Sequence, residues 1–385
     1  MAEYLSPGVY IEEFEMGAKP IQGVSTSTVG FVGVAETDTN RDVPTFVTSW
    51  GDFVKDYGRY GTKDTFLAPA VYSFFANGGK RCYVVNVKDH KEASLVGTDD
   101  GNGNRTGLQT LETVDEVSIV CIPGETAVNV QKAMITHCEK MGDRFCILDA
   151  QSGADLAAIK TQKEGLVSDK GVGALYYPWI TAPVELMVDG KVALSDKSVP
   201  PSGAVAGIYA RSDGERGVHK APANEIVRGV SSLERTITGG EQDTLNPLGI
   251  NCIRAFSGRG IRVWGARTIA PTGSEWNYVN VRRLFLFLEE SIDESTQWVV
   301  FEPNNEQLWA RVAQTVSNFL LGVWKSGALM GTTPEEAFFV KCDRTTMTQD
   351  DIDNGRLVVV IGVAPVKPAE FVIFRIAQWT GSSNN

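Results

Sequence analysis

The sequence contains little of the material that most enzyme chemistry requires, and it has no long apolar run. Only 3 of its 385 residues are histidine, which leaves little room for metal or acid–base chemistry based on imidazole. No two of its 6 cysteines have CxxC spacing, and no apolar stretch reaches the roughly 18–20 residues of a membrane-spanning helix. The start, MAEYLSPGVYIEEFEMG, lacks the basic and apolar regions of a signal peptide. We therefore expect no membrane insertion and folding in a cytoplasm.

The charge balance is acidic, because 36 Lys and Arg residues stand against 47 Asp and Glu residues, a net charge of −11. An acidic chain argues against direct nucleic-acid binding, which relies on basic surface. With 43% hydrophobic and 22% charged residues, the composition is that of a globular protein with two or three domains. Several cysteines lie inside apolar, β-like runs, and we interpret them as small buried residues in a reducing compartment. They are Cys82, Cys121, Cys146 and Cys252.

No motif for a cofactor, a metal ion or a catalytic nucleophile is present. The GxxxxGK[ST], GxSxG and HExxH patterns are all missing. Gly101-Asn102-Gly103 lies in a polar loop without the strand-to-helix context of a dinucleotide site, and residues 38–49 lack the glycine and glutamate of a calcium loop. Asp149 ends a predicted strand, where catalytic groups of α/β folds often lie, but no triad is recognisable around it. We expect no cofactor, no metal and no enzymatic activity, which favours a structural role.

Apolar patterning from 66 to about 180 predicts helices that alternate with buried strands. Nearly continuous apolar runs are typical of strands that are covered on both faces. This alternation predicts an α/β fold with a central, mostly parallel sheet. Small insertions are expected at about 88–115 and at 183–200, the second as a hairpin that turns at Asp189-Gly190. The predicted strands include Arg81–Val87, Val117–Ile122, Phe145–Leu148 and Gly173–Ile180.

We divide the chain into four parts. Residues 1–25, interrupted by glycine and proline, form an extended arm with one short strand, and 26–255 form the central α/β domain. Residues 256–369 form a C-terminal α+β domain, and 370–385 form a C-terminal strand or arm. Both ends are rich in β-prone residues, which are liabilities in a monomer unless another strand pairs with them.

The C-terminal domain is predicted to contain two long helices, Glu275–Ile292 and about Asn305 to Ser326. Apolar residues of the second helix recur with a 3.6-residue period. Both faces of the last predicted strand are mostly apolar, so we expect both to be covered, at an interface with another subunit. The predicted strands of this region are Trp298–Phe301, Phe338–Lys341, Leu357–Val363 and Phe371–Trp379.

Residues 249–283 carry six arginines against one acid, Glu275, a net charge of +5 within an acidic chain. Two interpretations are open: a solvated face with scattered ion pairs, or a contact surface for an acidic partner.

Several blocks of the sequence resemble contractile tail sheath proteins. The start, YLSPGVYIEEFEMGAKPIQGVSTSTVGFVGVA, is similar to the opening of these proteins. So are AVYSFFANGGKRCYVV, PSGAVAGIYARSDGERGVHKAPANE, GINCIRAFSGRGIRVWGARTIA and VAPVKPAEFVIFRI. The likeness runs from Tyr4 to Trp379. The family includes sheaths of contractile phage tails, R-type bacteriocins and extracellular contractile injection systems.

The resemblance implies a structural subunit without cofactors. Such proteins form a homo-oligomer, a helical sheath of stacked hexameric rings around an inner tube protein, bounded by baseplate and terminator or cap proteins. The sheath contracts and drives the tube through a target envelope. The resemblance also implies assembly in a bacterial host cytoplasm, as part of a virion tail or a phage tail-like particle.

The resemblance further implies that both arms add strands to the C-terminal domain of a neighbouring subunit. For such a sheath we predict that the C-terminal domain holds the tube and that part of the arginine-rich stretch supplies the attraction. The arm residues are Val9, Tyr10, Ile11, Phe371, Ile373, Phe374 and Ile376. The tube-facing arginines are expected to be Arg259, Arg282 and Arg283.

Two alternatives remain open on the sequence alone. A metabolic α/β enzyme with an unrecognised site would be a small oligomer that turns over metabolites. A baseplate or cap component of the same machine would form one ring and not a long polymer.

Overall fold

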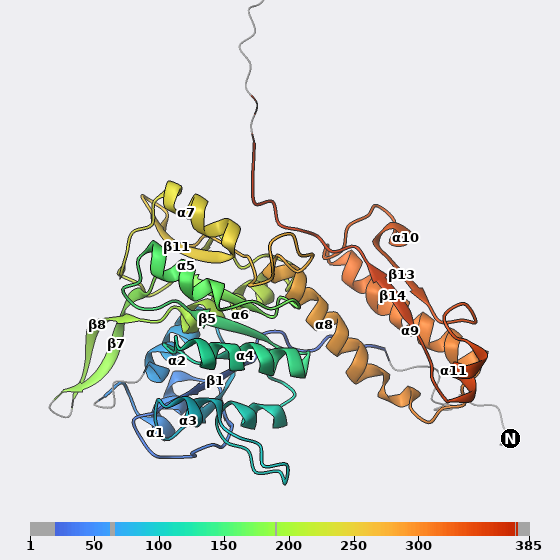
Figure 1. Cartoon of the computed structure of the whole chain (residues 1–385), viewed down its shortest axis with the longest axis horizontal. Helices are drawn as coiled ribbons and strands as arrows, with labels where there is room; N and C mark the ends of the chain where they lie inside the picture. The colour runs from blue at the N-terminus through green and yellow to red at the C-terminus, as the bar shows by residue number, and fades with distance from the viewer. Residues whose placement is uncertain (1–19, 62–65, 189–190, 374, 376–385) are drawn as a thin grey trace, which may run out of the picture. The chain divides into compact units, whose positions relative to one another are not determined.

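The computed structural model describes residues 20–61, 66–188, 191–373 and 375, and these form two compact units (Figure 1). The large unit contains Val24–Glu290 and the described residues from Pro365 onward. The small unit contains Ser291–Ala364 and residues 20–23. In chain order, the main part of the small unit is therefore an insertion between two parts of the large unit.

A nine-stranded sheet forms the centre of the large unit, in the order β2-β3-β1-β4-β5-β6-β11-β12-β9. The strands from β3 to β11 are parallel to their neighbours, whereas β2, β12 and β9 pair in antiparallel fashion at the edges. The prediction of a central, mostly parallel sheet is confirmed. The strands are β1 Val29–Gly33, β2 Thr45–Val47, β3 Cys82–Asn86, β4 Ile119–Cys121, β5 Phe145–Asp149, β6 Gly173–Tyr177, β9 Glu225–Ile226, β11 Ile250–Phe256 and β12 Gly260–Val263.

Helices cover both faces of this sheet, which is why its central strands are buried along their whole length. Neighbouring residues of β1 point to opposite faces, so that Phe31 belongs to one apolar core and Val32 to the other. The first core is formed with α1 Trp50–Tyr57, α2 Leu67–Ala76, α6 Ser202–Arg216 and the start of α8 Val279–Thr296. The second is formed with α3 Glu92–Val96, η1 Gly107–Thr113, α4 Val128–Met141, α5 Leu156–Glu164 and α7 Gly239–Leu245, which η2 Asn246–Leu248 follows.

Helices α2 and α6 approach each other with their backbones in contact. A Cβ atom at Gly203 would collide with the backbone of Ala70, and one at Gly207 would collide with the carbonyl oxygen of Phe74. Glycine is therefore required at these two positions of α6 by the packing and not by the helix itself.

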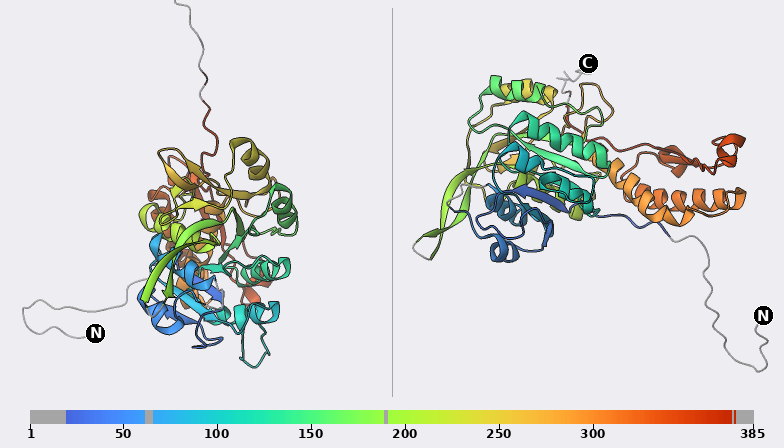
Figure 2. Two further views of the ribbon diagram at one scale, coloured as in Figure 1. Left: turned by 90° about the vertical axis from the view of Figure 1, so that its left-hand side faces the viewer. Right: turned by 60° about the horizontal axis from the view of Figure 1, so that its bottom comes forward.

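The two expected insertions have different outcomes. A hairpin forms from β7 Ile180–Val188 and β8 Lys191–Val199, as predicted, and β10 Ser232–Leu233 joins it. Figures 1 and 2 show the hairpin extending from the body of the large unit. The turn at Asp189-Gly190 lies outside the described residues. In contrast, 88–115 is part of the second core, because α3 and η1 bury Leu95, Leu108 and Leu111.

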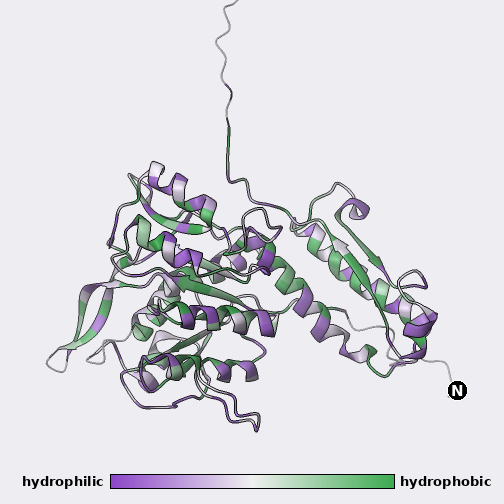
Figure 3. Cartoon of the chain, viewed as in Figure 1, coloured by the Kyte–Doolittle hydropathy of each residue, from purple (hydrophilic) through white to green (hydrophobic). Residues whose placement is uncertain are grey.

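The small unit combines helices with a two-stranded antiparallel sheet, β13 Phe338–Lys341 and β14 Val360–Val363. Its longest helix is α9 Glu306–Lys325, which Asn305 caps by accepting a hydrogen bond from the Leu308 amide at 3.0 Å. Figure 3 shows the hydrophobic strands and the mixed polarity of α9. The remaining elements are the end of α8, η3 Gln297–Val299, α10 Pro334–Ala337 and α11 Gln349–Asp353.

The structure corrects the expected domain boundary. The compact units meet between Glu290 and Ser291 and not between residues 255 and 256. The reason is that β12 pairs with β11 and β9 of the large sheet, and that Val279 and Leu286 of α8 fill the first core.

Two predicted strands of the C-terminal region are also corrected. Trp298–Phe301 forms the end of a 3-10 helix and a turn, with Val300 and Phe301 exposed. Of Phe371–Trp379, the described residues Phe371–Ile373 and Arg375 are exposed and not in a strand, and the rest lies outside the described residues.

All 6 cysteines are buried and free, which confirms their interpretation as small core residues. None of the described helices is long and apolar enough to cross a lipid bilayer.

Candidate subunit interfaces

The β13–β14 sheet of the small unit has only two strands among the described residues. Phe338 pairs with Val363 and Lys341 with Val360, and no third described strand extends either edge. An isolated two-stranded sheet is at best marginally stable in water, and its outer edges are templates for further strands. This sheet is therefore a candidate site for pairing with another chain.

One face of the same sheet is hydrophobic and exposed. Phe339 and Gly362 are cross-strand partners, and a Cβ at Gly362 would meet the Phe339 ring, so this ring lies across the glycine. The Phe339 side chain is 50% exposed, and its neighbour on this face, Val360, is exposed as well. Lys341 holds its ammonium group 5.8 Å from the centre of the Phe339 ring. The opposite face of β13 packs near α9.

The C-terminal segment returns to the large unit after the small unit ends. There the carboxylate of Glu370 accepts hydrogen bonds from Arg267, Tyr278 and Asn246. Immediately beyond it Phe371, Val372 and Ile373 are 72%, 69% and 78% exposed.

The predicted arm residues fall largely outside what the structure describes. This holds for Val9, Tyr10 and Ile11 and also for Phe374 and Ile376. Phe371 and Ile373 are described, and their exposure in the single subunit leaves them accessible to another chain. The role of these residues as linkers between subunits stays a prediction.

The structure corrects two of the three arginines that we expected to face a tube. Arg282 and Arg283 are buried within the large unit. Arg283 forms a 2.6 Å ion pair with Asp213 and donates to the Thr26 carbonyl at 2.7 Å. Arg282 forms a 3.1 Å ion pair with Glu289. Because the subunit itself binds both guanidinium groups, neither is presented to a partner.

Other arginines of the 249–283 stretch are used internally as well. Arg254 donates to the Ile237 carbonyl at 3.0 Å and to the Gln242 side chain at 2.9 Å. Arg259, in contrast, is exposed at the turn between β11 and β12. Its guanidinium lies 5.3 Å from the ring centres of both Phe256 and Trp264. Of the three predicted tube-facing arginines, Arg259 alone keeps that assignment.

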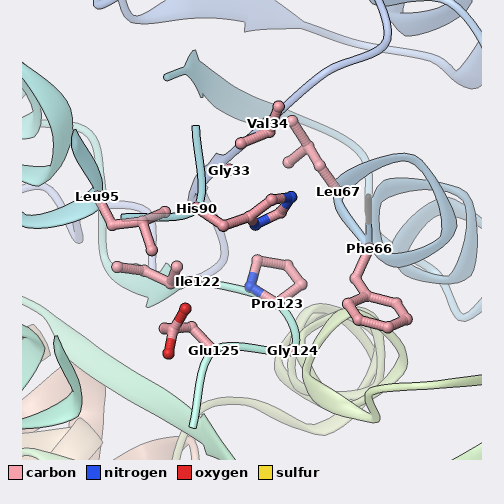
Figure 4. A pocket seen from close by; sticks show the side chains of 10 residues that line it. All are labelled: Gly33, Val34, Phe66, Leu67, His90, Leu95, Ile122, Pro123, Gly124 and Glu125. Carbon is pink, nitrogen blue, oxygen red and sulfur yellow. The ribbon is translucent and has the colours of Figure 1, made fainter. Parts of the chain in front are cut away.

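A small pocket lies at the carboxyl ends of β1 and β4, where α/β enzymes often bind ligands. Figure 4 shows its lining, in which His90 and Glu125 are the titratable residues. The Glu125 carboxylate accepts a hydrogen bond from the Ala127 amide at 2.8 Å. The lining contains no Ser, Thr, Cys or Lys that could act as a nucleophile. Across the described residues, no group of three or more His, Cys, Asp or Glu side chains could hold a metal ion.

Asp149, the carboxylate at the end of β5, binds groups within the fold. It is fully buried and accepts hydrogen bonds from the Gly124 amide at 3.0 Å and from the Ser202 amide and hydroxyl at 2.9 and 2.7 Å. Burial raises its pKa to about 6, and these hydrogen bonds limit the rise. Asp149 thus joins the loop after β4 to the start of α6.

The open edges of the β13–β14 sheet and the exposed apolar residues Phe371–Ile373 are features typical of a protein that binds other chains. Two family models match most of the chain: that of the phage tail sheath protein central domain at residues 101–269, and that of the phage tail sheath C-terminal domain at 272–378. The chain therefore belongs to the phage tail sheath protein family, and it is a subunit of a contractile sheath.

Solved structures of the same kind match along nearly the whole chain. A chain of the PVC sheath complex, an extracellular contractile injection system in the contracted state, is 32% identical, with 98% of this chain and 99% of that chain covered and a TM-score of 0.79. A chain of the contracted helical sheath of the anti-feeding prophage is also 32% identical, with coverages of 97% and 99% and a TM-score of 0.77.

Curated relatives are more distant. The putative prophage major tail sheath protein of Pseudomonas aeruginosa (strain UCBPP-PA14) is 24% identical, with 97% of both chains covered. The tail sheath protein of Vibrio phage KVP40 is 25% identical over 59% of this chain, and the match spans only 34% of that longer protein.

Sequence reasoning missed the side chains that gather around Glu370. Arg267 and Glu370 are 103 residues apart, and no local pattern links residues at that separation. The available signal was the presence of Arg267 among the closely spaced arginines.

Proposed function

We propose that this sheath subunit polymerises as stacked hexameric rings around an inner tube protein, between a baseplate and a terminator. Contraction of the sheath drives the tube through a target envelope. The observation that carries the proposal is the two-stranded β13–β14 sheet with open edges, in a chain whose described C-terminal residues Phe371–Ile373 are apolar and exposed. Full-length likeness to chains of contracted sheaths supports it.

The arms of neighbouring subunits complete the β13–β14 sheet in this proposal. The N-terminal arm contributes Val9–Ile11 and the C-terminal arm contributes Phe371–Ile376 as added strands. Strand addition supplies main-chain hydrogen bonds to each edge, and apolar side chains of the arms cover the Phe339 face. A marginal two-stranded sheet would then become a four-stranded one built from more than one subunit.

We propose that the tube contact includes Arg259, an exposed cation that lies at the β11–β12 turn of the large unit and not in the C-terminal domain to which the sequence assigned it. Exposed ion pairs are each worth only about 0–1 kcal/mol and are screened by salt. Such weak contacts suit a sheath that must release its tube, and many copies would still set the register during assembly. The protein in this proposal assembles in a bacterial cytoplasm, has no enzymatic activity of its own, and forms part of a tail or a tail-like particle.

A second candidate role is a sheath-like ring next to the baseplate. A chain from the anti-feeding prophage baseplate structure is 32% identical, with 98% of this chain and 100% of that chain covered and a TM-score of 0.75. A subunit of this kind would form a single ring and would not extend into a long polymer.

Electron microscopy of negatively stained particles tests both roles. The full chain is expressed with its tube protein, alongside a deletion of residues 1–20 and a truncation after Glu370. We expect long sheaths from the full chain and none from either shortened chain, with all three folded by circular dichroism. Leu194→Lys, on the exposed part of the β7–β8 hairpin, serves as a surface control. Normal sheaths from both shortened chains would refute the proposed arms, and single rings from the full chain would favour the baseplate role.

A further inference from the structure

The segment between the small unit and the C-terminal arm is held on the large unit at two points. The Val366 carbonyl accepts a hydrogen bond from the Asn280 side chain at 3.3 Å. Four residues later the Glu370 carboxylate is bound by three side chains. Pro365 and Pro368 restrict the backbone between the small unit and Glu370.

Both carboxylate oxygens of Glu370 are fully used. Oε1 accepts from Arg267 Nε at 3.0 Å and from Asn246 Nδ2 at 2.6 Å. Oε2 accepts from Arg267 Nη2 at 2.7 Å and from the Tyr278 hydroxyl at 3.1 Å. The two arginine bonds form a bidentate pair, which is among the strongest and most directional of side-chain contacts.

The three donor side chains are themselves fixed in place by the large unit. Arg267 pairs with Tyr278 through a backbone bridge, and its amide donates to the Asn251 side chain at 2.7 Å. Arg267 Nη1 also donates to the Asn246 carbonyl at 3.3 Å. Burial favours the neutral form of Glu370, but the hydrogen bonds from Arg267 and Asn246 hold the pKa of its carboxyl below the ordinary value. The receptor for the carboxylate is thus preorganised.

Solvent exposure changes abruptly at this residue. Glu370 is mostly buried in its ion pair, whereas Phe371 and the two residues after it are largely exposed. Glu370 is therefore the last described residue of the chain with side-chain anchorage to the large unit, and it stands directly before the predicted arm.

We propose that Arg267, Tyr278 and Asn246 act as a clamp on Glu370 that fixes the point and direction in which the C-terminal arm leaves the subunit. This inference rests on the proposed role of the arm as a link between subunits. The clamp residues are positioning residues, because they act on the partner subunit only through the arm.

The clamp has two physical consequences for such a link. Without it, the free tether would begin after the Val366 contact and would gain four residues, or about 13–14 Å of reach at roughly 3.3–3.6 Å per residue. The arm would then sample more directions, and the fraction of conformations aimed at a neighbouring sheet would fall. With the clamp closed, a pull on the arm during contraction passes into the large sheet of the unit and not into the edge strand β14.

The first experiment measures the clamp in free subunits. A nitroxide is attached through Val372→Cys, since the native cysteines are buried. Glu370→Gln should at least double the rotational mobility of the label, and Tyr278→Phe, which removes one bond, should give a smaller increase. Glu289→Gln, which removes the charge of the half-exposed ion-pair partner of Arg282, is the matched control and should leave the mobility of the label unchanged. Unchanged mobility in Glu370→Gln would overturn the clamp.

The second experiment measures assembly around the tube by electron microscopy, with the truncation after Glu370 as reference. We expect Glu370→Gln to keep a folded subunit and to reduce the yield of sheaths severalfold. A Gly-Ser insertion between Lys367 and Pro368, before the clamp, should be tolerated, whereas the same insertion after Glu370 should reduce the yield.

The outcomes separate the inference from the proposed function. If the truncated chain assembles normally, the proposed arm fails, and the clamp loses its role in assembly with it. If truncation abolishes assembly while Glu370→Gln assembles like the wild type with a mobile label, or if the two insertions behave alike, the arm stands and the positioning role of the clamp is refuted.

Discussion

Replacing Arg283 with methionine should destabilise the large unit strongly, because the substitution leaves the buried carboxylate of Asp213 without its cation. The two side chains are only 2% and 6% exposed. Arg283 Nη2 lies 2.6 Å from Asp213 Oδ2, and Nη1 lies 3.0 Å from Oδ1. The same guanidinium lies 4.6 Å from the ring centre of Tyr209. In Arg283→Met, Thr26 still donates its hydroxyl to Asp213 at 2.6 Å, but no positive charge compensates the carboxylate.

The magnitude follows from the asymmetry of buried ion pairs. Removal of one partner of such a pair costs about 3–5 kcal/mol, whereas replacement of both partners by apolar residues is often close to neutral. We therefore expect Arg283→Met to lower the free energy of unfolding by about 3–5 kcal/mol. The double variant Arg283→Met/Asp213→Leu should recover more than half of that loss.

Arg282, the residue directly before Arg283 in the same helix, provides the matched control. Its partner Glu289 is half-exposed and can be solvated by water when the arginine is removed. Arg282 also lies 4.6 Å from the ring centre of Trp276, a contact worth about 0.5–2 kcal/mol. Arg282→Met should therefore cost about 1–2 kcal/mol, clearly less than Arg283→Met.

Urea unfolding of the unassembled chain, followed by tryptophan fluorescence and circular dichroism, measures these differences. The reasoning is refuted if Arg283→Met costs no more than Arg282→Met and the double variant shows additive losses. A folded Arg283→Met subunit of normal stability that fails only to assemble on the tube would restore the assignment of Arg283 to the tube surface.

Three further changes test other parts of the structure. Burial raises the pKa of Asp149 to about 6 from 3.8, so its contribution to stability is present below pH 4 and is lost as the pH rises through 6, by about 3 kcal/mol at most. Asp149→Asn should remove this decline in the free energy of unfolding, measured with urea between pH 4 and pH 7. A wild-type stability that rises over this range relative to the variant would contradict the argument. Gly203→Ala should lower the free energy of unfolding by about 1–3 kcal/mol and with it the melting temperature, because the added Cβ overpacks the contact between α2 and α6. Gly214→Ala, at an open position of the same helix, should raise the free energy of unfolding by about 0.5–1 kcal/mol, and effects of equal sign would refute the close packing. Phe339→Lys should change subunit stability by less than about 1 kcal/mol but shorten or abolish sheaths in electron micrographs, and sheaths of normal length would exclude this face from the interface.

The central sheet could be predicted closely because its signals are local. Strand β5 is apolar at each position before Asp149 and is predicted to within one residue, and the 3.6-residue apolar period of α9 identifies this helix in the same way. In both elements the residues that decide the structure are neighbours in sequence. The boundary between the units was missed because it depends on β12 pairing with β9, which lies more than 30 residues earlier.

The interface residues were harder to predict, because a count of charges does not reveal their partners. The sequence left open whether the arginine-rich stretch forms scattered ion pairs or a contact surface; Arg283 pairs with Asp213, 70 residues away, and Arg267 pairs with Glu370, 103 residues away. The burial of Arg267 and Arg283 depends on these distant carboxylates, which no local pattern reveals. Arg254 and Arg262, like Arg259, form no ion pair with a described carboxylate, and Arg259 differs from them in being exposed at the turn between β11 and β12.

The path of the chain suggests how a sheath could rearrange without losing its links. In the proposed assembly, the small unit receives strands from neighbours at β13–β14, while the subunit gives its C-terminal strand from the large unit, at Glu370. Each C-terminal link would then join the large unit of one subunit to the small unit of another. The two units of one chain are connected by the continuous helix α8 at Glu290–Ser291 and by non-helical segments at Gly23–Val24 and Ala364–Pro365. A change in the relation of the units could therefore alter the spacing of subunits while each added C-terminal strand keeps its hydrogen bonds, because the strand would move with the small unit that receives it and its anchor would move with the large unit that supplies it.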